Sequence, residues 1–95
     1  MPAYVVTKIE VHDPVVFQAY IDASTATIRA FGGHHIARGA DAAVLEGDAN
    51  GLRNGIIQFA TIEDAEAWYN SPQYQAVQKL RENCATTHFY ALKGA

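Results

Sequence analysis

The chain has 95 residues, of which 49% are hydrophobic and 18% are charged, and its formal net charge at pH 7 is -3. A chain of this length forms one modest core, so we expect a single domain over residues 1–95 and exclude most larger enzyme architectures. The lysine and arginine residues are scattered singly, without the basic stripe that a nucleic-acid backbone requires, so nucleic acid is excluded as a partner.

The apolar stretches are far shorter than the roughly 20 residues that span a bilayer, so no membrane segment is predicted. The N-terminal residues lack the basic region that begins a secretory signal. The chain contains one cysteine, Cys84, which cannot form an internal disulfide. Together these features favour a reducing, cytoplasmic location.

The chain begins with a predicted strand and a long helix. Residues 3–11 are rich in β-branched side chains and predict the strand. Asp13 is the expected N-cap of the helix, and Pro14 suits its first position, where a missing N–H costs nothing. Apolar residues at helical spacing continue to Phe31, and the glycines at 32–33 end the helix.

Short strands are expected next, because β-type segments alternate with turn residues. They are predicted roughly at 34–38 and 42–46, with a turn or bulge between them. Residues 47–51 are rich in Gly, Asp and Asn and predict a loop. Residues 55–60 form a further predicted strand.

The last part of the chain predicts a broken helix and a final strand. Thr61 and Asp64 have the spacing of a capping box at a helix start. Ser71 and Pro72 then resemble a fresh N-cap and first helical residue, so the helix is expected to continue at an angle. Residues 86–92 form the closing strand.

This order predicts an α+β, ferredoxin-like βαββαβ fold, with a four-stranded antiparallel sheet and its helices on one face. The other face would then expose a mixture of apolar and polar side chains: Tyr4, Val6, Lys8, Ile56 and Gln58 or their neighbours, His88 and Tyr90. Exposed apolar patches of this kind usually mark an interface. We therefore predict a two-fold homodimer that packs sheet to sheet.

Three segments of the chain, residues 32–39, 44–48 and 67–75, resemble the corresponding parts of one small family. The chain is similar over nearly its whole length to the domain-of-unknown-function family 1330, within the dimeric α/β-barrel superfamily of ferredoxin-like proteins. The resemblance implies a dimer with a barrel-like interface between the sheets. It does not indicate which reaction, if any, the protein catalyses, because the family has no assigned reaction. The wider superfamily includes cofactor-independent monooxygenases, small isomerases and haem-binding proteins, so the fold alone permits many chemistries.

Arg38 and Glu46 are the first candidate site residues, because they are predicted on adjacent short strands where they could meet. The planar fork of Arg38 could hold a substrate carboxylate while Glu46 acts as a base. The alternative is an ordinary ion pair that fixes the hairpin.

The histidines are the next candidates. His34 and His35 are adjacent, so on a strand they point to opposite faces and only one can face a cavity. His35 or His88 could carry a proton, or either could simply form local hydrogen bonds. No metal-ligand spacing is present, so neither a metal site nor a cofactor is predicted.

Aromatic residues gather around the predicted helix break. Trp68 is expected in the core, whereas Tyr69 and Tyr74 could line a cleft or fill the notch of the break. Arg81 falls seven residues after Tyr74, on a similar helix face, and could bring a positive charge to that cleft. Cys84 is predicted to be a buried small hydrophobic residue.

Two functions of different classes remain open from the sequence. The first is a cofactor-independent enzyme or binding protein for a small organic acid or aromatic compound. The second is a non-catalytic dimeric module, structural or regulatory, in which the same residues only stabilise the sheet and its interface.

Overall fold

The structure is a computed structural model that describes residues 1–39, 42–48 and 52–95. Its elements follow the predicted βαββαβ order, with the second helix broken into two pieces and a 3-10 turn. They are β1 (Ala3–Val11), α1 (Pro14–Ala30), β2 (His34–Gly39), β3 (Arg53–Phe59), α2 (Ile62–Asn70), α3 (Pro72–Gln78), η1 (Lys79–Arg81) and β4 (Ala85–Lys93).

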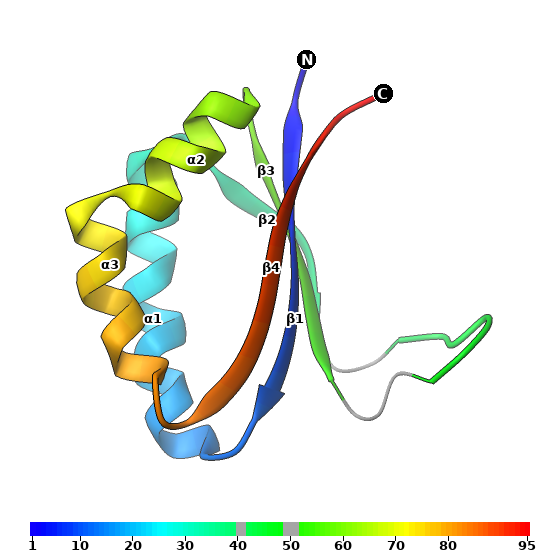
Figure 1. The fold of residues 1–95 in the computed structure, drawn as a ribbon, viewed down its shortest axis with the longest axis vertical. Helices are drawn as coiled ribbons and strands as arrows, with labels where there is room; N and C mark the ends of the chain where they lie inside the picture. The colour runs from blue at the N-terminus through cyan, green and yellow to red at the C-terminus, as the bar shows by residue number, and fades with distance from the viewer. Residues whose placement is uncertain (40–41, 49–51) are drawn as a thin grey trace.

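The four strands form one antiparallel sheet in the order β2-β3-β1-β4. All helices of the described residues lie on one face of this sheet, and the described residues place no helix on the opposite face (Figure 1). We call the two sides the inner face and the open face. The predicted ferredoxin-like arrangement is therefore confirmed.

Local capping explains where the helices begin. Asp13 Oδ1 accepts hydrogen bonds from the backbone N–H groups of Val15 and Val16, both at 3.2 Å. Thr61 Oγ1 accepts from the N–H of Asp64 at 3.1 Å, and Ser71 Oγ accepts from the N–H of a residue three positions later at 3.1 Å. These bonds satisfy amides that have no partner within the helix, so all three predicted helix starts are confirmed.

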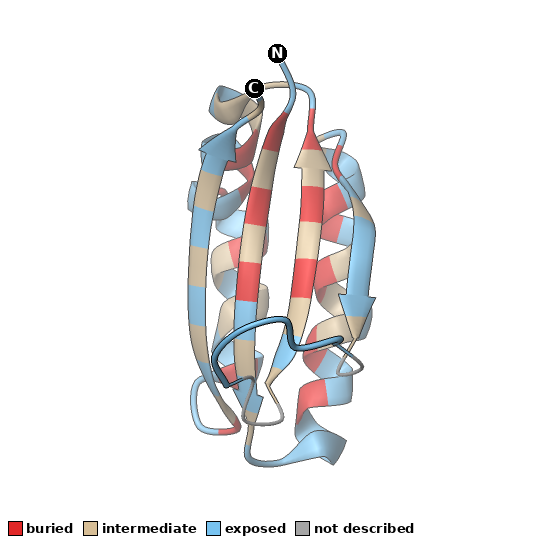
Figure 2. Ribbon diagram, turned by 90° about the vertical axis from the view of Figure 1, so that its right-hand side faces the viewer, coloured by how far each residue is buried: buried red, intermediate tan, exposed pale blue. Residues whose placement is uncertain are grey.

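The core lies between the helices and the inner face. Alternate residues of the two central strands are buried, as Figure 2 shows in a view onto the open face. Val5, Ile57 and Phe59 supply these inner positions, and Trp68 and Tyr74 pack on them from the helical layer. Burial alternates from residue to residue along these strands, as expected for a sheet that packs against helices on one face and is open on the other.

The predicted strand at 42–46 is wrong, because residues 42–48 form an exposed loop that extends beyond the open face (Figure 1). β2 instead pairs with β3, which pairs on its other side with β1. This pairing gives the central strands partners on both sides and buries their inner residues, whereas a strand at 42–46 would have only the outer edge of β2. Residues 42–45 are apolar, but only Val44 is β-branched, and the segment has no such partner.

The predicted turn or bulge at 39–41 includes residues 40–41, which lie outside the described residues. The same holds for residues 49–51 of the predicted loop. Within the described ranges, no helix is both long enough and apolar enough to cross a membrane.

Candidate functional site

A cavity of about 270 Å³ lies between α1 and the inner face of the sheet. Its floor includes Thr7 and Ile57 of the central strands, and its roof includes Ile21 and Ser24 of α1. Trp68 closes one side from α2. Apolar and polar groups both line this cavity, as in small-molecule sites, and its volume is slightly below the range of about 300–1,000 Å³ that is usual for them.

A β-bulge in β2 places His35 and Arg38 together at this cavity. His35 pairs with Ile57 of β3, and Arg38 pairs with Gly55, so the register shifts between them at Ile36. Without the bulge, side chains three positions apart would point to opposite faces. Because of the shift, both side chains line the same chamber.

Arg53 is a cavity residue that the sequence analysis missed. It begins β3 on the inner face, and its guanidinium carbon lies 5.9 Å from the centre of the Phe17 ring on α1. It also lines the cavity. Every second residue of β3 points to the inner face, as Ile57 and Phe59 do. The same alternation, continued towards the N-terminus through Gly55, places Arg53 on this face.

The charged groups at the cavity are of one sign. Arg38 and Arg53 line it, and among the described residues no aspartate or glutamate does. This local excess of positive charge contrasts with the net charge of -3 for the whole chain. A cavity lined by one sign of charge attracts ligands of the opposite sign.

His35 is half-buried at the same rim. Loss of solvent lowers the pKa of His35 from its usual value of 6.5, and the neighbouring Arg38 lowers it further. The ring is therefore neutral near pH 7, and one of its nitrogens can accept a proton.

This pKa shift predicts a pH dependence of stability. Above pH 6.5 both the folded and unfolded states hold a neutral ring, so the contribution of His35 is fully present there. As the pH falls below that value, the unfolded state takes up a proton before the folded state does, and stability is lost. Urea unfolding should show that wild-type protein loses more stability than His35→Gln between about pH 7.5 and pH 5.5. Parallel pH profiles would contradict this expectation.

The floor of the cavity depends on a close approach between two strands. A Cβ atom added to Gly55 would lie 2.7 Å from Thr7 Oγ1, so any larger residue would force the Thr7 side chain to shift. Thr7 is almost fully buried, and it lines the cavity. Glycine in a strand often marks such a close contact.

Tyr20, Tyr74 and Arg81 form a buried polar cluster between α1, α3 and η1. The hydroxyls of Tyr20 and Tyr74 lie 2.7 Å apart and share a hydrogen bond, and Arg81 Nη2 donates to the Tyr74 hydroxyl at 3.3 Å. Burial raises the pKa of Tyr20 far above its usual value, and Tyr74 raises it further. Burial alone would lower the pKa of Arg81, but its bonds to the tyrosines raise it, so Arg81 stays charged and Tyr20 stays protonated.

The predicted site residues thus separate into three places. His35 and Arg38 lie at the cavity, while Tyr74 and Arg81 lie in the buried cluster. Tyr69 is partly exposed, and its hydroxyl accepts a hydrogen bond from Gln78 Nε2 at 3.2 Å. Trp68 and Cys84 are buried, as predicted.

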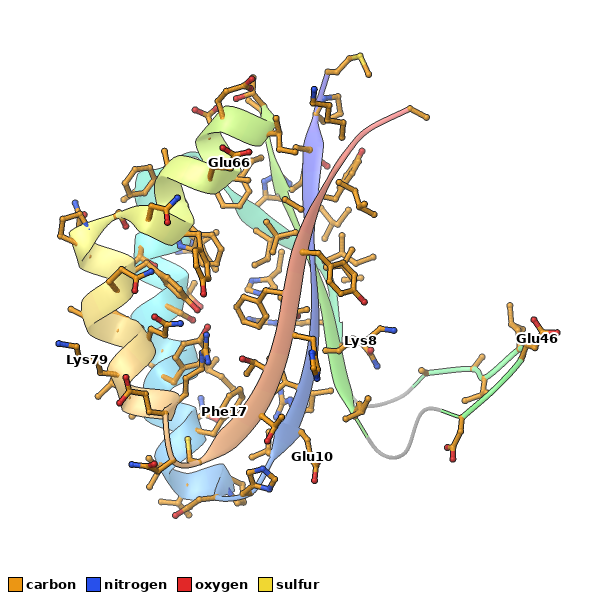
Figure 3. All side chains as sticks on the ribbon, in the orientation of Figure 1. Lys8, Glu10, Phe17, Glu46, Glu66 and Lys79 are labelled. Carbon is orange, nitrogen blue, oxygen red and sulfur yellow. The ribbon has the colours of Figure 1, made fainter. Side chains whose placement is uncertain are left out.

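Glu46 and His88 are not brought to the cavity. Glu46 lies on the exposed loop, directed away from the sheet (Figure 3). Arg38 lies on β2 opposite Gly55 of β3. The predicted strand-to-strand pair of Arg38 with Glu46 is therefore wrong. His88 is exposed on the open face of β4, opposite Lys8. Among the described residues, no group of three His, Cys, Asp or Glu side chains is placed to hold a metal ion.

Comparison with known proteins agrees with this fold. The family model for a domain of unknown function, DUF1330, matches residues 2–95, which confirms the resemblance found in the sequence. No curated protein matches the chain.

Solved structures also match. A protein of unknown function from Rhodopseudomonas palustris has a TM-score of 0.80 at 16% identity, with 99% of this chain and 82% of that chain covered. SnoaB, a cofactor-independent oxygenase from Streptomyces nogalater, has a TM-score of 0.73 at 10% identity, with coverage of 99% and 93%. A dimeric protein of unknown function with a ferredoxin-like fold, from Bacteroides fragilis, has a TM-score of 0.59 at 11% identity, with coverage of 98% and 96%. At such identities the likeness establishes the fold.

Proposed function

Since this chain belongs to the DUF1330 family of domains of unknown function, we propose its activity from the cavity: it binds a small organic anion beneath α1. The ligand is a carboxylate with an aromatic or aliphatic body. Arg38 and Arg53 hold its charged group, and neutral His35 accepts a proton from it where a reaction follows.

One observation carries this proposal: a partly apolar chamber is lined by two arginines and, among the described residues, by no acidic side chain. A guanidinium offers a planar pair of donors that matches a carboxylate, and the apolar floor suits the body of the ligand. The shared fold of SnoaB supports cofactor-independent chemistry as a candidate activity for this family. It does not identify the reaction.

Benzoate is a suitable probe, because it combines a carboxylate with an apolar ring. The single tryptophan, Trp68, lines the cavity, so its fluorescence should change in a saturable way as benzoate binds. Nuclear Overhauser effects from the benzoate ring to the methyl groups of Ile21 and Ile57 should place the ligand. Arg38→Met combined with Arg53→Met is expected to weaken binding roughly tenfold or more, because charge-assisted hydrogen bonds are lost.

Lys79→Met is the control, because it replaces a basic side chain with methionine at an exposed position on the outer side of the helical layer (Figure 3). It should leave the affinity for benzoate unchanged. The proposal is wrong if neither benzoate nor other small carboxylates and aromatics bind and the arginine variants alter only stability. The protein would then be better described as a non-catalytic dimeric module.

We also propose that the working unit is a two-fold homodimer that pairs the open faces. Val6, Ile56 and Tyr90 lie together on that face, and Tyr90 is 45% exposed. The loop at 42–48 extends on the same side and carries Leu45, which is 97% exposed (Figure 1). Covering these side chains would remove a large apolar area from water. The matching protein from Bacteroides fragilis is described as dimeric, which supports a dimer.

A cytoplasmic location is part of the same proposal. Cys84, the single cysteine, is a buried free thiol whose Sγ lies 3.7 Å from the carbonyl oxygen of Leu80. A free thiol is typical of a reducing compartment.

A further inference from the structure

The guanidinium of Arg81 is buried without a carboxylate partner. The side chain is only 7% exposed, and among the described residues no aspartate or glutamate forms a salt bridge with it. A buried charge is costly unless it is paired and hydrogen-bonded. Arg81 is therefore a charge for which the described part of the chain supplies no counter-ion.

The protein uses only part of the hydrogen-bonding capacity of Arg81. Nη1 donates to Thr87 Oγ1 at 2.9 Å, and Nη2 donates to the Tyr74 hydroxyl at 3.3 Å. Nε is buried and has no partner. Each of Nη1 and Nη2 carries a second N–H beyond the one used in these bonds, and these remaining donors can bind a ligand.

Aromatic rings hold the guanidinium in place. Its central carbon lies 5.3 Å from the centre of the Tyr20 ring and 5.0 Å from the centre of the Phe89 ring. Cation–π attraction offsets part of the cost of burial and keeps the group charged. It supplies no negative charge, so the guanidinium remains able to bind an anion.

Arg81 also lines a hollow of about 350 Å³ at the edge of β4. The other described residues that line it are aromatic or polar, and none of them is acidic: Tyr69, Gln78, Thr87, His88, Phe89 and Tyr90. Phe89 is the one lining residue that this hollow shares with the cavity beneath α1. The two spaces therefore use different arginines.

We propose that Arg81 and Thr87 form a second anion-binding site, which takes a small carboxylate from the hollow at the β4 edge. The carboxylate supplies the missing counter-charge to Arg81, and the rings of Tyr69, Phe89 and Tyr90 contact its apolar body. A planar carboxylate matches the guanidinium fork, and it fits the flat aromatic walls. This site goes beyond the cavity proposal and does not depend on it.

The test is a titration of ¹⁵N-labelled protein with acetate and benzoate, followed by the backbone amide signals of Thr87 and Phe89 and by the arginine Nε–H signals. We expect saturable shifts at Thr87 and Phe89, and a shift of one Nε–H signal that is missing in Arg81→Met. Binding read from these signals should weaken at least tenfold in Arg81→Met and stay unchanged in Lys79→Met. Benzoate should bind more tightly than acetate if the aromatic walls contact the ligand.

Arg81→Met is expected to fold, because the hydrogen bond between Tyr20 and Tyr74 does not require Arg81. Should it fail to fold, Arg81→Lys keeps the charge, loses the planar fork and should still weaken binding several-fold. Absence of saturable shifts at Thr87 and Phe89 would overturn the proposal, as would equal binding by wild type and the Arg81 variant.

Failure of this site is distinguishable from failure of the cavity. Variants at Arg38 and Arg53 should keep the Thr87 response, because neither residue lines the hollow at β4. Conversely, nuclear Overhauser effects from benzoate to the methyl groups of Ile21 and Ile57 follow the cavity, because neither residue lines that hollow.

Discussion

Replacing Trp68 with alanine is expected to lower the free energy of unfolding by about 3–5 kcal/mol, the range for removing a large buried aromatic side chain. Trp68 is 1% exposed. Its ring centre lies 4.4 Å from that of Tyr74 and 5.6 Å from that of Phe59. The substitution would leave a void where α2, α3 and β3 meet, and these elements can relax only partly to fill it.

Trp68 also satisfies a buried polar group, which gives a graded control. Its Nε1–H donates to Thr27 Oγ1 at 3.1 Å, and the Thr27 hydroxyl donates in turn to the carbonyl oxygen of Ser24 at 2.7 Å. Trp68→Phe keeps most of the ring packing and loses this hydrogen bond, so its loss of stability should be clearly smaller.

Urea unfolding followed by far-ultraviolet circular dichroism measures both variants, because this signal does not depend on the tryptophan. Samples are compared at one protein concentration, since dimerisation would make stability depend on concentration. A loss below about 1 kcal/mol for Trp68→Ala would contradict the packing account, because that value is typical of a minor substitution.

The second large effect concerns the open face. Val6→Asp is expected to raise the dissociation constant of the proposed dimer at least about 100-fold, because burying an unpaired carboxylate costs several kcal/mol. Val6 lies at the middle of this face, between Ile56 of β3 and Tyr90 of β4. Its inner neighbours are unaffected, so the subunit should remain folded. Light scattering over a range of protein concentrations measures the change.

Val15→Asp is the matched control, because it makes the same substitution at a site 83% exposed in the first turn of α1. A carboxylate there interacts favourably with the helix dipole, so assembly and stability should be retained. A wild-type protein that is monomeric at micromolar concentration would refute the dimer. An unchanged dissociation constant in Val6→Asp would show that the dimer interface does not include this face.

The cavity depends on features that sequence periodicity could not predict. The bulge at Ile36 brings His35 and Arg38 to one side of β2, although strict alternation would separate them. It arises from the register between β2 and β3, a contact between segments far apart in the chain. The predicted partner of Arg38, Glu46, lies on the exposed loop because β2 pairs with β3, which leaves only the outer edge of β2 for a strand at 42–46.

The sequence by itself determined the helix starts, the alternation of inner and open faces, and the ferredoxin-like order. Each depends on residues within a few positions of one another, such as Thr61 with Asp64 or Ser71 with Tyr74. Only the tertiary structure decided which charges meet at the cavity and that Arg81 is buried without a carboxylate partner among the described residues. These outcomes depend on strand register and on packing between distant elements, which local patterns do not specify.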